Sequence, residues 1–170
     1  MTGLVRALAD IALLRRDPSG LPSSWPSIAV FVLVYASADV AVARVAGIQP
    51  VLARTAADLA LTLPFFWLLL AFTRRAHRFP QTINAVLGVY VLLAPIVILL
   101  LLLRLPARSN AALSLLVTAS YTVFVIWYLL VVGHILRSAL DTGLVTGFAI
   151  AVTWLVASIA LSQSLFGAPA

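Results

Sequence analysis

The residue with the greatest chemical potential in this sequence is Asp39, the only ionisable side chain well inside a long apolar segment. An isolated carboxylate at such a depth costs on the order of 2.5–3.5 kcal/mol on membrane-insertion scales, so it needs a partner or water. In the next apolar segment Arg54, Asp58 and Thr62 recur every four residues and share one helical face. We therefore expect a polar cluster in which two or more arginines neutralise both carboxylates. Its candidate members are Asp39, Arg44, Arg54, Asp58 and Arg104.

Two interpretations of this cluster stay open. A paired carboxylate inside a membrane can serve only to fix the register of its helices. A carboxylate that exchanges a proton, an ion or a lipid headgroup would instead be a functional site. We favour structural pairing.

The remaining residues offer little for catalysis or metal binding. The sequence has no Cys and no Glu, and His77 and His134 lie at the ends of apolar segments. It contains no phosphate-binding loop, dinucleotide-binding motif or nucleophile elbow. Asp141-Thr142-Gly143 matches the aspartic-protease tripeptide, but no second copy of that motif exists. We expect no enzymatic activity, no catalytic residue, no metal and no cofactor.

The composition predicts a membrane protein. Of the 170 residues, 64% are hydrophobic and 9% are charged, against about 25% charged in a typical soluble domain. A chain this apolar cannot cover a water-facing surface. The net charge of +6 comes entirely from arginine and aspartate, and arginines between apolar runs are typical of membrane orientation signals. Abundant Arg, Ala and Leu without Lys or Glu indicate GC-rich coding, so we expect a bacterial membrane protein. We expect no nucleic-acid partner.

Five apolar segments have about the 20 residues that a membrane helix needs. Short connections make consecutive segments antiparallel neighbours, so the predicted fold is an all-α integral membrane protein with a five-helix transmembrane bundle. The alternative omits the second, aspartate-bearing span and has four. The five predicted spans are 26–47, 55–73, 83–103, 111–133 and 142–166.

The first 25 residues form a separate unit in front of the bundle, which covers 26–170. Leu4, Leu8 and Ile11 recur at helical spacing, which predicts a short amphipathic interfacial helix over 3–16 on the cytoplasmic membrane surface. The alternative is a frayed tail. The segment Asp17-Pro18-Ser19-Gly20 matches a type I turn. A proline-rich elbow leads from this turn to the first span.

The arginines also predict orientation, because they concentrate in cytoplasmic connections. If the N-terminus is cytoplasmic, seven arginines lie on the cytoplasmic side. The other four, which include Arg108, lie on the opposite side. We therefore expect a multi-pass protein of the bacterial inner membrane with its C-terminus on the opposite side; the four-span alternative puts both ends in the cytoplasm. The residues expected to contact lipid headgroups are Arg74, Arg75, Arg78 and Arg137.

Small residues mark a packing face on the last span. Gly143, Gly147 and Ala151 follow one another in steps of four, a spacing that lets membrane helices approach closely. We expect this face to pack inside the bundle; the alternative is a contact between copies of the chain.

Five spans in nearly the whole chain, a cytoplasmic N-terminus and the elbow Asp17-Pro18-Ser19-Gly20-Leu21-Pro22 resemble bacterial Yip1-domain proteins. The resemblance covers most of the chain and lies in the layout. It implies an integral membrane protein and assigns no functional residue.

Two functions stay open. The first is a non-enzymatic membrane interaction, assembly or membrane-organising protein, with lipids, partner transmembrane helices or further copies of itself as partners. The second is a small transporter, channel or lipid-moving protein that uses the polar cluster around Asp39. A water-filled cavity at Asp39 would favour the second, whereas a dry, paired core with an exposed small-residue groove would favour the first.

Overall fold

The computed structural model describes residues 2–107 and 110–167, and Arg108 lies outside them. The described residues are almost entirely helical and contain no strand, and five helices are long and apolar enough to cross a membrane. The predicted fold is confirmed: the protein is an all-α, membrane-spanning bundle of five helices behind a short N-terminal helix. The elements are α1 (Thr2–Ala12), η1 (Pro18–Gly20), α2 (Trp25–Val45), α3 (Val51–Phe72), η2 (Ala76–Arg78), α4 (Phe79–Ala107), α5 (Ala111–Leu140) and α6 (Leu144–Phe166).

Three spans extend by four or more residues beyond their predicted apolar segments. α3 begins at Val51 rather than at residue 55, α4 covers Phe79–Ala107 rather than 83–103, and α5 ends at Leu140 rather than at residue 133. The residues added to α5, about two turns, include the buried Ile135, Leu136 and Leu140. Hydropathy measures the fit of a segment to lipid, so it does not detect a helix end that protein contacts stabilise.

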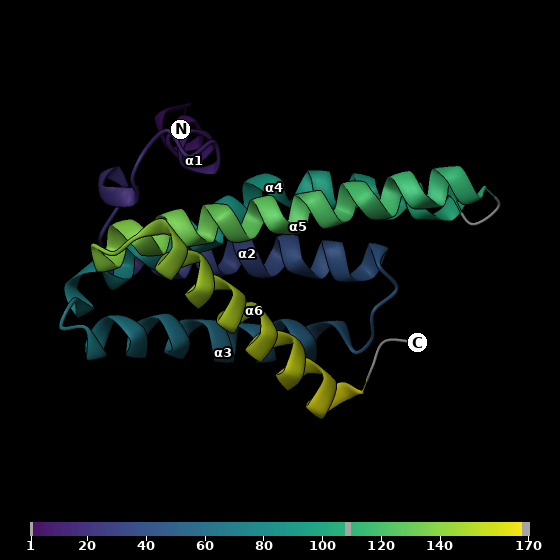
Figure 1. Ribbon diagram of the computed structural model, residues 1–170. Helices are drawn as coiled ribbons and strands as arrows, with labels where there is room; N and C mark the ends of the chain where they lie inside the picture. The colour runs from purple at the N-terminus through teal and green to yellow at the C-terminus, as the bar shows by residue number, and fades with distance from the viewer. Residues whose placement is uncertain (1, 108–109, 168–170) are drawn as a thin grey trace.

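The main helix contacts form a ring. α4 lies between α2 and α5, α2 is followed by α3, α3 contacts α6, and α6 returns to α5. In Figure 1, α2, α4 and α5 run side by side while α6 crosses obliquely from the end of α5 toward α3. α2 and α6 are therefore not neighbours in the ring, and they are linked mainly through α3.

The centre of the bundle holds an aromatic chain with one ring from each span. Its order around the bundle follows the ring of helices, from α2 through α4, α5 and α6 to α3. All ring separations fall in the range in which aromatic pairs attract one another. The centroids of successive rings lie 4.6, 6.3, 6.4 and 5.6 Å apart in the order Tyr35, Tyr90, Tyr128, Trp154 and Phe66.

Backbones of α5 and α6 approach closely at two glycines. A Cβ added to Gly147 would overlap the carbonyl oxygen of Gly133, and one added to Gly133 would lie 2.8 Å from the backbone nitrogen of Phe148. Ala151, one turn beyond Gly147, is fully buried. Gly143 precedes the helix as its N-cap and has open space around it. The small-residue face thus packs inside the bundle through two of its three predicted members, with Gly133 as their partner.

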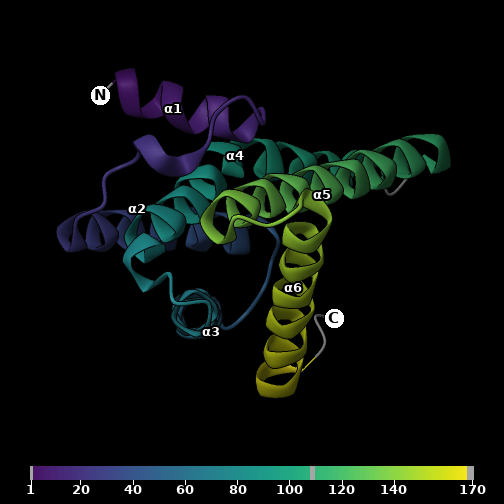
Figure 2. The ribbon, with the colours of Figure 1, turned by 60° about the vertical axis from the view of Figure 1, so that its left-hand side comes forward.

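The N-terminal helix packs against the bundle. Ala7, Leu8, Ile11 and Ala12 are buried, and Leu8 occupies the space that the missing side chain of Gly88 leaves on α4. Figure 2 shows α1 lying against α4. Leu8 and Ile11 of the predicted apolar face are therefore buried in the protein, whereas Leu4 is exposed.

We predict that Gly147→Leu destabilises the fold by about 1–3 kcal/mol or more, because the new side chain forces the α5–α6 contact apart. The melting temperature in detergent measures this loss. Thr153→Leu, at an exposed position of the same helix, is the control and should change stability by less than about 0.5 kcal/mol. Equal melting temperatures for Gly147→Leu and the unmodified protein would contradict the close contact.

Candidate functional site

The two intramembrane carboxylates are held by a crossed pair of hydrogen bonds between α2 and α3. Thr55 of α3 donates its hydroxyl hydrogen to Oδ2 of Asp39 on α2. In the other direction, the hydroxyl of Tyr35 on α2 donates to Oδ2 of Asp58 on α3 at 2.5 Å. Each helix therefore supplies one carboxylate and one hydroxyl, and the pairing fixes the register between them.

Two further helices complete the carboxylate contacts. Tyr90 of α4 donates to Oδ1 of Asp39 at 2.8 Å, and Ser158 of α6 donates to Oδ1 of Asp58 at 2.7 Å. Each of the four carboxylate oxygens thus accepts one hydroxyl hydrogen bond. These bonds join four of the five spans at one level of the bundle.

α3 and α6 meet along a ladder of three polar contacts. Because the helices run antiparallel, residues spaced by four on one helix match residues spaced by four on the other. The predicted shared face of Arg54, Asp58 and Thr62 therefore exists, but it faces α6. Its three contacts are Arg54 Nη1 to Ser162 Oγ at 3.0 Å, Ser158 Oγ to Asp58 Oδ1 at 2.7 Å, and Trp154 Nε1 to Thr62 Oγ1 at 3.2 Å.

Arg54 also binds the C-terminal end of α6. Its Nη2 lies 3.4 Å from the carbonyl oxygens of Phe166 and Gly167, and its guanidinium lies 5.0 Å from the ring centre of Phe166. A guanidinium stabilises this end of a helix because the unpaired carbonyls there carry partial negative charge.

The expected neutralisation of the carboxylates by arginine is wrong. Within the described residues, no arginine nitrogen lies within 4.0 Å of Asp39 or Asp58. Arg54 is directed to α6, Arg44 is exposed at the end of α2, and Arg104 is exposed and stacks on a tyrosine ring. Hydroxyl groups at the depth of the carboxylates supply hydrogen bonds without the burial of a guanidinium, whose charge favours the membrane surface.

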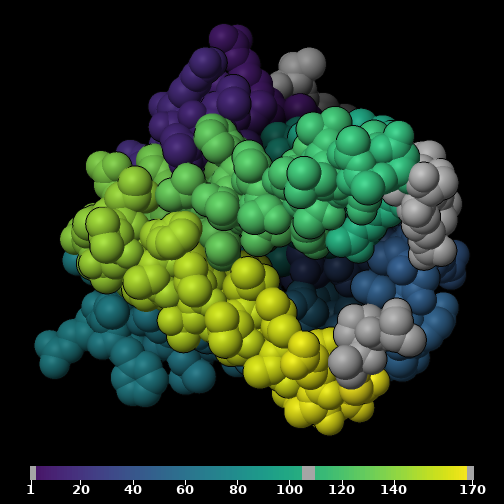
Figure 3. All heavy atoms as spheres, turned by 45° about the vertical axis from the view of Figure 1, so that its right-hand side comes forward, coloured from purple at the N-terminus to yellow at the C-terminus, as the bar shows by residue number. Residues whose placement is uncertain are grey.

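A pocket of about 320 Å³ opens beside the two carboxylates, between α2, α3 and α6. It lies toward the end of the bundle where α2 and α6 finish, and Figure 3 shows the surface hollowed between α6 and the blue α2–α3 segment. Two carboxylates and one guanidinium, that of Arg54, lie on its wall, so its lining is net negative when both carboxylates are ionised. Its polar lining consists of Asp39, Arg54, Asp58, Ser158, Ser162 and Gln163, and its apolar lining of Ala43, Ile48, Ala57, Leu155, Ile159 and Leu161.

The sequence interpretation identified the carboxylates and missed their donors. Tyr35 precedes Asp39 by one helical turn, a spacing that could have indicated a shared face. Tyr90 carries no such signal, because only the fold brings α4 beside α2. The described residues contain no group of three or more His, Asp, Cys or Glu side chains that could hold a metal ion.

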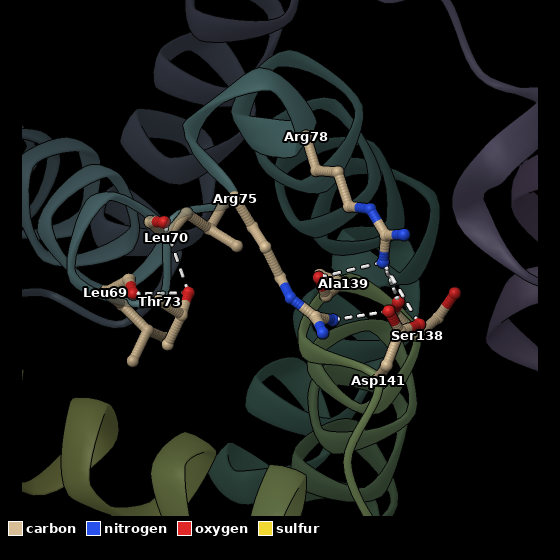
Figure 4. A network of polar contacts seen from close by, with 8 residues as sticks. All are labelled: Leu69, Leu70, Thr73, Arg75, Arg78, Ser138, Ala139 and Asp141. Atoms are coloured by element: carbon tan, nitrogen blue, oxygen red, sulfur yellow. Dashed lines mark hydrogen bonds and ion pairs between the residues drawn. The ribbon is translucent and has the colours of Figure 1, made fainter.

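At the opposite end of the bundle, two predicted headgroup contacts bind a protein carboxylate instead. Nη1 of Arg75 lies 2.6 Å from Oδ2 of Asp141, and Nη1 of Arg78 lies 3.1 Å from Oδ1. Arg78 also donates to the carbonyls of Ser138 and Ala139 at the end of α5 (Figure 4). Arg74 and Arg137 remain exposed. We call this the basic end.

Asp141 is outside the spans, and its protonation follows from these contacts. The hydrogen bond from Arg78 and the charges of Arg75 and Arg78 lower the pKa of the Asp141 carboxyl below its usual value of 3.8. The carboxylate therefore favours the folded state above that usual pKa, and the contribution disappears as the pH falls through the lowered value.

We predict that Tyr35→Phe lowers the free energy of unfolding by about 1–3 kcal/mol, because it leaves an oxygen of Asp58 without its donor inside the membrane. Tyr128→Phe is the control, since its hydroxyl forms no hydrogen bond within the part of the chain that the structure describes. Unfolding in a mixed-detergent titration measures both variants. Equal losses would contradict a specific role of the Tyr35 hydroxyl.

A second prediction concerns the basic end. Asp141→Asn should slightly lower the melting temperature at pH 7 in low salt, and the difference from the unmodified protein should disappear as the pH falls below 3.8 and through the lowered pKa of Asp141. The melting temperature as a function of pH measures both effects. Asp10→Asn is the control, because Asp10 forms no ion pair with any described residue. A difference that persists unchanged at low pH would exclude the ion pairs as its cause.

Comparison with known proteins finds no matching family model, no similar characterised protein and no similar solved structure. The resemblance to Yip1-domain proteins therefore stays a prediction. The site is interpreted from its own geometry.

Proposed function

We propose that this protein is a small membrane transporter that binds a monovalent organic cation in the pocket between α2, α3 and α6. The observation that supports it is a pocket whose wall carries Asp39 and Asp58, two carboxylates that no described arginine neutralises. This geometry favours the transporter hypothesis over the assembly hypothesis, because Gly147 and Ala151 are buried inside the bundle and offer no exposed groove to a partner helix.

The negative charge of the two carboxylates must be balanced by a second group. Two ionised carboxylates inside apolar spans are costly unless a proton or a cation balances them. Each carboxylate oxygen accepts one hydrogen bond from a hydroxyl and keeps a further lone pair. A cation bound at these oxygens supplies the balancing charge.

The size of the pocket selects the class of cation. A volume of about 320 Å³ is at the lower end of the range for small-molecule sites, and it is far larger than a bare alkali ion. The described pocket lining contains no aromatic side chain, so the two carboxylates supply the attraction for an ammonium group. No chemical conversion is part of the proposal, and the protein is not proposed as an enzyme.

Orientation and location complete the proposal. The arginines favour a bacterial inner membrane with the basic end and the N-terminus in the cytoplasm. The pocket would then open in the half of the membrane away from the cytoplasm.

Cation binding tests the proposed function. Tetramethylammonium is titrated into the protein in nanodiscs, and titration calorimetry measures its binding. We predict saturable binding that is at least tenfold weaker in Asp39→Asn and in Asp58→Asn. Asp10→Asn is the control. Ala57→Leu, which fills the pocket and leaves both carboxylates in place, should also abolish binding. Undiminished binding in the double variant Asp39→Asn/Asp58→Asn would contradict the proposed site.

A further inference from the structure

We propose that the cation is amphipathic and enters the pocket sideways from the lipid, between α2 and α6, with its ammonium group at Asp39 and Asp58 and its apolar chain along α6. This inference rests on the proposed function, and it specifies the substrate class and the route.

The pocket wall has two chemical faces. Its polar lining includes Asp39, Asp58 and Ser158, whereas Leu155 and Ile159 of α6 are apolar. A small hydrated cation would leave the apolar face in contact with water. A cation with an alkyl chain covers it, and each buried methylene group strengthens binding further.

Ile159 marks the route. It lines the pocket, yet 48% of its surface is exposed on a helix long and apolar enough to span the membrane. A residue that is both exposed and part of the pocket wall lies at the mouth, and Gln163, one turn nearer the end of α6, meets the same description. α2 and α6 are joined mainly through α3 rather than packed on each other, so the pocket is open between them.

Depth and charge disfavour entry from the end of the bundle. Asp39 lies six residues from the end of α2 and Asp58 seven residues from the start of α3, which is about 9–10 Å at 1.5 Å per residue. Arg54 lies one turn closer to that end, on the same face of α3 as Asp58, and is tied to the end of α6. A cation arriving along the bundle axis therefore meets a guanidinium before it reaches the carboxylates, whereas the lateral route avoids this charge.

The test compares octyltrimethylammonium, tetramethylammonium and 1-octanol on the protein in nanodiscs, with protein-free nanodiscs as the correction for partition into lipid. We expect octyltrimethylammonium to bind at least tenfold more tightly than tetramethylammonium. We also expect Asp39→Asn to weaken it at least tenfold and 1-octanol not to compete with it. Equal affinities of the two ammonium ions would overturn the lateral, amphipathic inference and leave the cation site intact. Binding of neither ion would overturn the proposed function itself, and competition by 1-octanol would reduce the site to an apolar groove and overturn the inference.

Variants at the mouth test the route separately. Ile159→Trp should weaken octyltrimethylammonium at least tenfold while tetramethylammonium binding changes less than twofold. Val156→Trp is the matched control, because Val156 is exposed on the same helix but does not line the pocket. Equal effects of the two tryptophans on octyltrimethylammonium would contradict entry beside Ile159.

Discussion

The arrangement of the bundle depends on the need to satisfy two carboxylates inside a membrane. Neither Asp39 nor Asp58 can be left without partners in an apolar surrounding. Their hydrogen-bond donors come from each other's helix and from two further helices, α4 and α6. Four hydroxyl donors therefore specify how α2, α3, α4 and α6 lie relative to one another. Dispersion between aliphatic side chains and lipid gives no such specificity, because both surfaces are equally apolar.

The other contacts follow from this polar layer. The aromatic chain is joined to it through two of the four donors, Tyr35 and Tyr90. α5 contributes no hydrogen bond to the carboxylates, and it is attached through Tyr128 and through the close approach of Gly133 to Gly147. α6 is thus held by a tight glycine contact near its start and by a polar ladder to α3 along its length. The pocket remains where α6 and α2 have no extensive contact.

The sequence predicts where the helices lie along the chain better than it predicts which helices pack against one another. Hydropathy identifies all five spans, because each must match the membrane, and the spacing of Leu4, Leu8 and Ile11 identifies the N-terminal helix. Hydropathy does not detect the C-terminal end of α5, which Arg78 and buried contacts stabilise. In the site, an intramembrane aspartate is conspicuous on its own, whereas Tyr90 acquires its role only because α4 packs beside α2. Opposite charge predicts arginine as the partner of each carboxylate. Hydroxyls at the same depth instead satisfy a carboxylate without burying a second ion.

The central claim is that the oxygens of Asp39 and Asp58 bind a cation in the pocket. Infrared difference spectroscopy of the carboxyl bands, before and after saturation with octyltrimethylammonium in nanodiscs, tests it most directly. The account predicts a shift of the carboxylate bands on saturation, and no such change in the double variant Asp39→Asn/Asp58→Asn. Carboxyl bands that do not change on saturation, or that change equally in the double variant, would contradict it.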